Sequence, residues 1–222
     1  MPIVLIIWGF FVFLFCYLLG SIPFSWIVAT LYGKNLYQIG SGNVGAANVW
    51  RATQRVEALL MALAGDVGKG ALAMLLAQKF SESCFAPYLS VAQTIAAFSV
   101  ILGHNWPIFL KFKGGRGLAA LGGAVAFLNI KLIFIVLVTI AFFIFLTEFI
   151  MKKGIKIGGN LKEKIKGLFT IFISQVLGRM IGILAAVILV LVFYPQIFKV
   201  VFPAVILSGI KHIKRTKEFL KK

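Results

Sequence analysis

The segment from Gly40 to Arg51 combines residue types that bind phosphate groups. It reads Gly-Ser-Gly-Asn-Val-Gly-Ala-Ala-Asn-Val-Trp-Arg. Glycines let backbone N–H groups approach an anion, and Arg presents a planar charged fork that matches phosphate oxygens. An ordinary turn is the alternative, but two amides and an Arg among so many small residues favour phosphate binding. The predicted phosphate ligands in this segment are Gly40, Ser41, Gly42, Asn43, Asn48 and Arg51.

A second candidate segment, residues 103–117, carries a histidine and a basic, glycine-rich turn. The turn is Lys113-Gly114-Gly115-Arg116, and it precedes a short apolar run. If that run is a helix, the positive end of its dipole also favours an anion at the turn. His104 could hydrogen-bond a substrate hydroxyl or carry a proton, whereas a purely structural histidine is the alternative. The neighbouring turn favours the functional interpretation.

Asp66 and Lys69 are spaced to lie on one face of a helix. Charged side chains at membrane depth are costly, so they pair with each other or face a cavity. A structural ion pair and a direct substrate contact are equally compatible with this spacing. We therefore expect both residues to support the site. His212, in a basic tail that could also serve only as an anchor, is a further supporting candidate.

The composition indicates that lipid surrounds most of the chain. Hydrophobic residues make up 61% and charged residues 13% of the 222 residues, and the mean hydropathy is +1.01. About 20 consecutive apolar residues span a bilayer as a helix, and several runs approach this length. These runs are continuous rather than alternating, which excludes a membrane β-barrel. The sequence thus predicts an all-α integral membrane protein of about seven helices, some short or broken.

The apolar runs define the expected helices. They lie near residues 3–30, 56–78, 88–109, 117–128, 131–151, 167–193 and 197–211. The fourth is too short to cross a bilayer alone, so we expect a partial or tilted helix packed among its neighbours. The sequence shows no internal repeat or low-complexity linker. We expect one polytopic membrane domain, residues 1–222.

The basic residues predict the orientation. With the amino terminus outside, the four inner segments carry 18 of the 23 Lys and Arg residues. This imbalance places the carboxyl terminus and both phosphate-binding segments in the cytoplasm, on the inner face of the cell membrane. Anionic lipid headgroups explain the net charge of +17 better than nucleic acid does. No cysteine spacing or nucleotide fingerprint predicts a metal or cofactor.

These motifs together resemble the bacterial acyl-phosphate-dependent glycerol-3-phosphate acyltransferases. The similarity covers about residues 15–128. The matching stretches are Gly20-Ser-Ile-Pro23, Ser41-Gly-Asn43-x-Gly-Ala-x-Asn48-x-x-Arg51, Asp66-x-x-Lys69-Gly70, Gly103-His104-x-x-Pro107 and Phe112-Lys113-Gly-Gly-Arg116-Gly. The chain is thus similar to a divergent member of that family.

The resemblance implies a reaction. A fatty acyl group would pass from acyl phosphate to the 1-hydroxyl of glycerol 3-phosphate, giving lysophosphatidic acid and phosphate. It implies catalytic roles for Ser41, Arg51 and Arg116 in holding phosphate groups and for His104 in organising the reacting hydroxyl. Lys113, Gly114 and Gly115 would help to bind phosphate. The implied partners are acyl phosphate, glycerol 3-phosphate and membrane lipids, without nucleic acid or cofactor, and we expect a monomer.

The chain departs from the family pattern in two places. Arg116 stands where the family usually has Lys, and the third motif is reduced to Lys211-His212 with Arg215 nearby. An inactive membrane paralogue is therefore one alternative. A transporter of a phosphorylated solute or lipid is another, because broken helices and intramembrane charges also mark transport sites. The absence of an inverted repeat favours the enzyme.

Overall fold

A computed structural model describes residues 2–84, 86–150 and 176–220, and within these ranges every regular element is helical. Among the described residues, four helical segments are long and apolar enough to cross a membrane: Ile3–Leu31, Val56–Glu82, Ala86–Leu110 and Ile130–Thr147. The chain is an all-α, multi-pass membrane protein, as expected. Its elements are α1 (Pro2–Ser21), α2 (Phe24–Leu31), α3 (Ala46–Thr53), α4 (Val56–Cys84), η1 (Ala86–Tyr88), α5 (Leu89–Asn105), η2 (Ile108–Leu110), α6 (Leu118–Leu128), α7 (Ile130–Ile150), α9 (Val176–Phe193) and α10 (Pro195–Leu220).

The helices form two groups. The described residues within 1–129 and 199–222 make up the first, and the described residues within 130–198 make up the second. The single membrane domain stays a prediction. All candidate site residues belong to the first group.

The expected first helix, residues 3–30, is in fact two helices. α1 ends at Ser21 and α2 begins at Phe24. Pro23 causes the break, because proline has no N–H to donate and disfavours helical geometry in the residue before it, Ile22. The carbonyl of Ile22 therefore lies outside a regular helical ladder, where a side chain can reach it.

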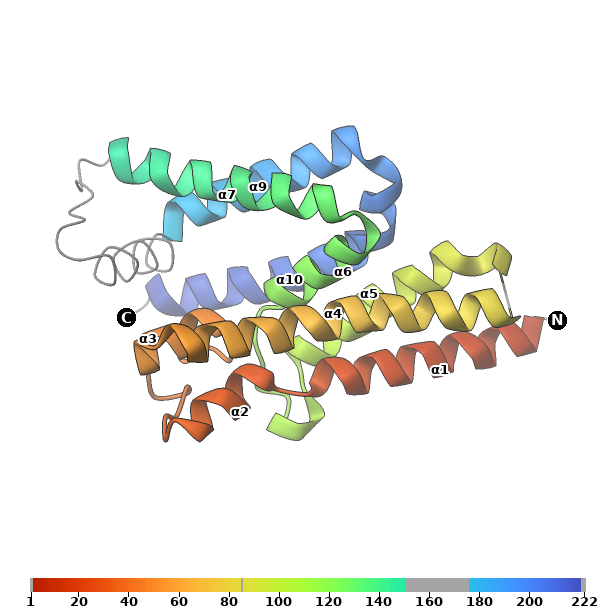
Figure 1. Ribbon diagram of the computed structural model, residues 1–222, viewed down its shortest axis with the longest axis horizontal. Coiled ribbons are helices and arrows are strands. Elements are labelled where there is room, and N and C mark those ends of the chain that lie inside the picture. The colour runs from red at the N-terminus through yellow and green to blue at the C-terminus, as the bar shows by residue number, and fades with distance from the viewer. Residues whose placement is uncertain (1, 85, 151–175, 221–222) are drawn as a thin grey trace. The chain divides into compact units, whose positions relative to one another are not determined.

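Glycines let α1 lie against α5 in the first group (Figure 1). A Cβ on Gly20 would collide with the Val100 carbonyl, and one on Gly103 would collide with the Tyr17 carbonyl. Only glycine allows this backbone approach, which is a common way for helices to associate in lipid. The close contact fixes the end of α5, where His104 lies.

The short helix α6 packs on α4 in the same manner. Gly70 of α4 faces the Ala120 carbonyl, and Gly123 of α6 faces the Val67 carbonyl, with no space for a Cβ at either position. With 11 residues, α6 matches the expected partial helix. Its start is thereby held beside the middle of α4, which carries Asp66 and Lys69.

In the second group, α9 packs against α7. Gly178 and Gly182 lie against the α7 backbone near Ile144 and Ile140. The expected helix 167–193 is present from Val176, and residues 167–175 lie outside the described part of the chain. α4 and α10 extend beyond the expected limits, to Cys84 and to Leu220.

The helix α3 is not among the helices expected from the apolar runs. The second half of the segment from Gly40 to Arg51 is helical. Ala and Arg favour helix, and Val49 and Trp50 are buried on one side, so burial stabilises the element. Gln54 ends the helix in the left-handed conformation. The first candidate segment is therefore a loop followed by a helix.

Candidate active site

Asn48 holds the loop before α3 in place. Its Nδ2 atom donates hydrogen bonds to the carbonyls of Leu36 and Ile39, both at 3.0 Å, and its Oδ1 atom accepts one from the Ser41 N–H at 3.3 Å. The side chain is buried. The side-chain amide of Asn48, which was expected to bind phosphate, therefore binds backbone groups of the loop that contains Ser41.

Gly40 and Gly42 shape this loop, since both have positive φ values, 56° and 62°. A Cβ on Gly40 would lie 2.6 Å from Oδ1 of Asn48 and 3.0 Å from Cδ of Arg51. The aliphatic part of Arg51 thus packs across Gly40. Arg51 is half-buried, and burial lowers the pKa of its guanidinium from the ordinary value. Arginine side chains nevertheless stay protonated in proteins. A cation therefore lies beside the loop.

Asn43 offers an unused polar group. Its Oδ1 atom is buried and has no hydrogen-bond partner among the described residues. A buried polar atom of this kind is costly unless it is satisfied. Because an amide carries both an acceptor and donors, Asn43 can bind a substrate hydroxyl or a phosphate oxygen.

A buried polar cluster connects α2, α4 and α5. Oδ1 of Asp66 lies 2.9 Å from Nζ of Lys69 and 3.5 Å from Nδ1 of His104. The Ser25 hydroxyl donates a hydrogen bond of 2.6 Å to Oδ2 of Asp66, and Lys69 donates one of 2.9 Å to the Ile22 carbonyl. Asp66 thus contacts both Lys69 and His104, the other two residues singled out from the sequence on these helices.

The basic turn encloses His104. The Gly115 N–H donates a 3.0 Å hydrogen bond to the His104 carbonyl. A Cβ on Gly115 would collide with Nε2 of His104 and with the carbonyl of Val44, while one on Gly114 would collide with Pro107. Val44 belongs to the first candidate segment and Gly115 to the second, so the two segments meet beside the imidazole.

A second contact joins the loops. The hydroxyl of Tyr37 donates a 2.8 Å hydrogen bond to the Lys113 carbonyl. Lys113 itself is exposed. Its ammonium group can therefore reach an anion in solvent while its backbone is fixed.

α10 reaches the same turn. The Ser208 hydroxyl donates a 2.7 Å hydrogen bond to the Arg116 carbonyl, and Nδ2 of Asn105 donates one of 3.2 Å to the Leu207 carbonyl. His212, one turn further along, has Nδ1 3.0 Å from the Ser208 carbonyl. The structure thus brings the expected supporting residue His212 near Arg116, from the far end of the sequence.

Sequence reasoning missed the partners that hold these groups. Ser25, Tyr37 and Ser208 were not singled out, although each donates a hydrogen bond to a site residue, and neither was Asn105, which joins the end of α5 to α10. A buried serine within an apolar span, such as Ser25, is a usable signal because a polar group in lipid needs a partner. Which residue it pairs with depends on tertiary contacts.

Comparisons with known proteins indicate the family of the chain. A family model described as glycerol-3-phosphate acyltransferase matches residues 10–159. The glycerol-3-phosphate acyltransferase of Anaplasma marginale (strain Florida) is 39% identical over 132 residues, which cover 58% of this chain and 63% of that protein. The Zymomonas mobilis enzyme of the same name is 46% identical over 118 residues, 50% of this chain and 54% of its own length. The chain thus spans less than two thirds of these curated relatives.

Two solved structures resemble the whole fold. They are crystal structures of PlsY (YgiH), an integral membrane glycerol 3-phosphate acyltransferase, in glycerol 3-phosphate and lysophosphatidic acid forms. Each has a TM-score of 0.65 and 27% identity, covering 96% of this chain and 90% of PlsY. Since the family model also covers more than half of the residues, the chain belongs to the glycerol-3-phosphate acyltransferase family.

Proposed function

We propose that the protein transfers a fatty acyl group from acyl phosphate to the 1-hydroxyl of glycerol 3-phosphate in phospholipid synthesis. The contact between Val44 and Gly115 beside His104 carries the proposal, because it joins two anion-binding segments at one ionisable side chain. Both substrates contain phosphate, so two such segments match them. The products are lysophosphatidic acid and inorganic phosphate.

The chemistry needs no covalent enzyme intermediate. The 1-hydroxyl oxygen attacks the carbonyl carbon of the acyl phosphate, a C–O ester bond forms, and the carbon–oxygen bond to phosphate breaks. The hydroxyl proton goes to the departing phosphate, directly or through Nε2 of His104, so that hydrogen phosphate leaves. Holding both phosphates supplies proximity and stabilises the developing negative charge.

The side chains divide into two roles. Ser41, Asn43, Arg51, Lys113 and Arg116 bind phosphate oxygens together with the backbone of Gly40, Gly42, Gly114 and Gly115. Asn48 positions the loop through its bonds to the Leu36 and Ile39 carbonyls. Asp66 and Lys69 position His104, and His212 supports the turn through the Ser208 contact.

We place the active site on the cytoplasmic face of the inner membrane. The charge distribution supports this orientation, with the amino terminus outside and the carboxyl terminus inside. Glycerol 3-phosphate and the phosphate end of acyl phosphate then bind from the cytoplasmic side, and a monomer contains every group named above.

The test is an assay of purified protein in detergent or lipid. We expect acyl phosphate and glycerol 3-phosphate together to release phosphate and lysophosphatidic acid in equal amounts. Acyl-CoA in place of acyl phosphate should give no product, because it lacks the acyl-linked phosphate. Transfer from acyl-CoA, or an acceptor other than glycerol 3-phosphate, would contradict the proposal.

A further inference from the structure

The hydroxyl of Ser208 in α10 bonds to another part of the chain. Ser208 is buried, and its Oγ atom donates a 2.7 Å hydrogen bond to the Arg116 carbonyl. A serine or threonine inside a helix commonly donates to a carbonyl one turn earlier in its own helix, as Ser21, Ser99 and Thr147 do here. The Ser208 contact is instead a tertiary one, and it joins α10 to the basic turn.

The carbonyl that Ser208 binds lies outside the hydrogen-bond ladder of α6. Gly117 precedes this helix in the left-handed conformation, with a φ of 81°, and its own carbonyl accepts the bond from the Leu121 N–H. The partly buried carbonyl of Arg116, one residue earlier, therefore needs a partner outside α6. The N–H of the preceding residue, Gly115, is bonded to the end of α5. The backbone is thus held on both sides of Arg116.

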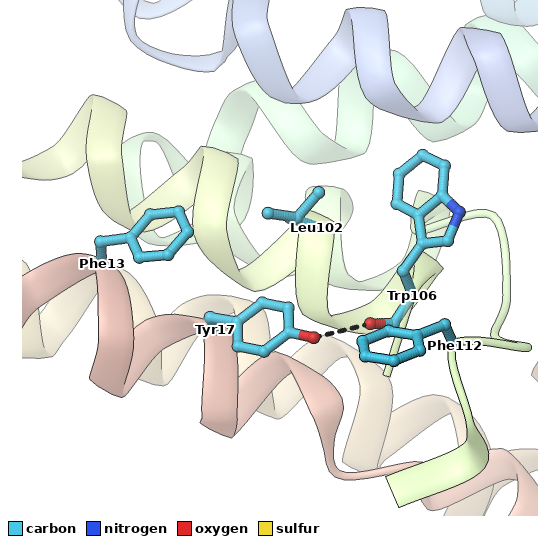
Figure 2. A pocket seen from close by; sticks show the side chains of 5 residues that line it. All are labelled: Phe13, Tyr17, Leu102, Trp106 and Phe112. Carbon is cyan, nitrogen blue, oxygen red and sulfur yellow. Dashed lines mark hydrogen bonds between the residues drawn. The ribbon is translucent and has the colours of Figure 1, made fainter. Parts of the chain in front are cut away.

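Two residues at the end of α5 hold α10 in register. Nδ2 of the buried Asn105 donates a 3.2 Å hydrogen bond to the Leu207 carbonyl, and Nζ of Lys211 lies 4.7 Å from the centroid of the Trp106 ring. Trp106 is itself fixed to α1, because its carbonyl accepts a 2.9 Å hydrogen bond from the Tyr17 hydroxyl (Figure 2). The two α10 contacts lie on either side of the serine in sequence, so they determine which residue of α10 faces the turn.

Asn105 also contacts the turn directly. Its Oδ1 atom is buried and has no hydrogen-bond partner among the described residues, and a Cβ on Gly117 would lie 3.0 Å from it. A buried acceptor of this kind costs stability, and an apolar side chain of similar shape would avoid that cost. The bond that Nδ2 of Asn105 donates to α10 therefore gives this asparagine its structural purpose.

The backbone position of Arg116 matters because arginine binds phosphate through a planar fork. The N–H groups of a guanidinium have a fixed geometry, whereas the ammonium group of a lysine is a point charge on a flexible stem. A shift of the arginine Cα therefore misaligns two hydrogen bonds to a phosphate at once. The side chain of Arg116 is half-buried, so it has little freedom to compensate for such a shift.

We propose that Ser208 is a positioning residue for the Arg116 guanidinium, and that Asn105 keeps Ser208 opposite the turn. The proposal rests on the function proposed above, in which Arg116 binds a substrate phosphate. In this role Ser208 touches no reacting atom, and it affects the reaction only through the orientation of the arginine.

A double-mutant cycle between Ser208→Ala and Arg116→Ala is the direct test. In the wild-type background, Ser208→Ala should lower kcat/KM about tenfold or more, since a displacement of about 1 Å in an active site can cost about 100-fold. In the Arg116→Ala background, the same change should cost less than about twofold, because the fork that it misaligns is absent. Equal losses in the two backgrounds, or no loss in the wild-type background, would overturn the proposal.

Two further readouts separate positioning from stability. In an Arg116→Lys background, Ser208→Ala should cost less than in the wild type, because an ammonium group needs no fixed orientation. Ser208→Ala should also change kcat and KM in the same sense as Arg116→Ala does, by a smaller factor. A change confined to a parameter that Arg116→Ala leaves unaltered would contradict the role of Ser208.

The matched control is Ser99→Ala. Ser99 is also buried, but its hydroxyl donates to the Ile95 carbonyl of its own helix. Its kcat/KM should stay at the wild-type value in both Arg116 backgrounds. If Ser99→Ala reproduces the loss and its dependence on Arg116, the effect is not specific to the Ser208 contact and the proposal is wrong.

A second variant covers the case in which Ser208→Ala does not fold. Asn105→Leu removes the hydrogen bond to α10 together with the unsatisfied Oδ1 atom, and the Leu207 carbonyl stays within the α10 helix. We expect a loss of kcat/KM that again depends on the guanidinium of Arg116. Wild-type kcat/KM in folded Asn105→Leu would exclude its part in placing Ser208.

Phosphate binding can be measured apart from catalysis, by calorimetric titration of the purified protein with inorganic phosphate. Ser208→Ala should raise the Kd when Arg116 is present and leave it unchanged in Arg116→Ala. If this coupling is found but no donor supports acyl transfer, the proposed function alone is rejected. If Arg116→Ala binds phosphate as tightly as the wild type, Arg116 is not a phosphate ligand and the positioning role of Ser208 is refuted.

Discussion

Lys69 donates a 2.9 Å hydrogen bond from Nζ to the carbonyl oxygen of Ile22, the residue before the proline that separates α1 from α2. The carbonyl left free by the helix break therefore accepts a hydrogen bond from the buried ammonium group. The same ammonium group lies 2.9 Å from Asp66, which contacts His104. A proline in the first span thus helps to determine where the candidate catalytic histidine lies.

Lys69→Met should destabilise the protein strongly. It leaves the buried carboxylate of Asp66 without its cation, and removing one partner of a buried ion pair costs about 3 to 5 kcal/mol. The double variant Asp66→Asn with Lys69→Met removes both charges and should recover part of that loss. Thermal unfolding in detergent measures both. If the double variant is less stable than Lys69→Met, the ion pair is not the cause.

Gly115→Ala should abolish most activity while the helices still form. The new methyl group would collide with Nε2 of His104 and the Val44 carbonyl, so the turn or the imidazole must move. A displacement of about 1 Å in an active site can cost about 100-fold in rate. Steady-state kinetics and circular dichroism test this together.

The matched control is Gly68→Ala on α4. Nothing lies within 4 Å of a Cβ at this position, so activity should be retained. Alanine favours helix over glycine by up to about 1 kcal/mol, so thermal stability should be equal or higher. Equal activity in both glycine variants would refute the close approach at Gly115.

Arg51→Ala should remove a phosphate contact. The loss of a charge-assisted contact with an anion costs about 2 to 4 kcal/mol, or about 30- to 1,000-fold in kcat/KM. Arg51→Lys should fall between wild type and Ala, because it keeps the charge and loses the planar fork. Near-normal kcat/KM in folded Arg51→Ala would rule out a phosphate-binding role.

Initial rates should show a ternary complex. If the acceptor hydroxyl attacks acyl phosphate directly, both substrates are bound before phosphate leaves, and double-reciprocal plots intersect. Parallel lines would indicate a covalent acyl-enzyme. Ser41 is then the candidate nucleophile, and labelled acyl phosphate without acceptor should leave a stable acyl group on it. The direct mechanism predicts no such label.

Cysteine labelling tests the orientation. In a background lacking Cys16 and Cys84, an impermeant maleimide should label Lys79→Cys and Lys131→Cys in intact cells, and Lys34→Cys only after the cells are opened. Lys34, Lys79 and Lys131 are all exposed, so burial does not explain a difference between them. Labelling of Lys34→Cys in intact cells would reverse the topology.

Three features could not be predicted from sequence patterns: the helix break at Pro23, the helix α3 and the hydrogen-bond partners of Asn48. Pro23 was visible within the first apolar run, but hydropathy alone extends a span through a proline, since neighbouring groups can satisfy the backbone in lipid. α3 was missed because glycines and amides dominate the first half of its segment, whereas the burial of Val49 and Trp50 stabilises the second half. Asn48 was expected to bind phosphate, yet its amide bonds Leu36 and Ile39, a choice that depends on the folded loop.

The sequence by itself determined that lipid surrounds the chain and that the fold is helical, and it predicted two candidate anion-binding segments, because hydropathy and residue type are local properties. It also supplied Asp66, Lys69 and His104 as isolated polar residues in apolar surroundings. Only the tertiary structure decided that these three touch, that Gly115 closes on His104, and that Ser208 of α10 reaches the Arg116 carbonyl. Contacts between residues tens of positions apart depend on how glycine-lined helices approach each other in lipid, and this approach depends on complementary surfaces rather than on any single segment.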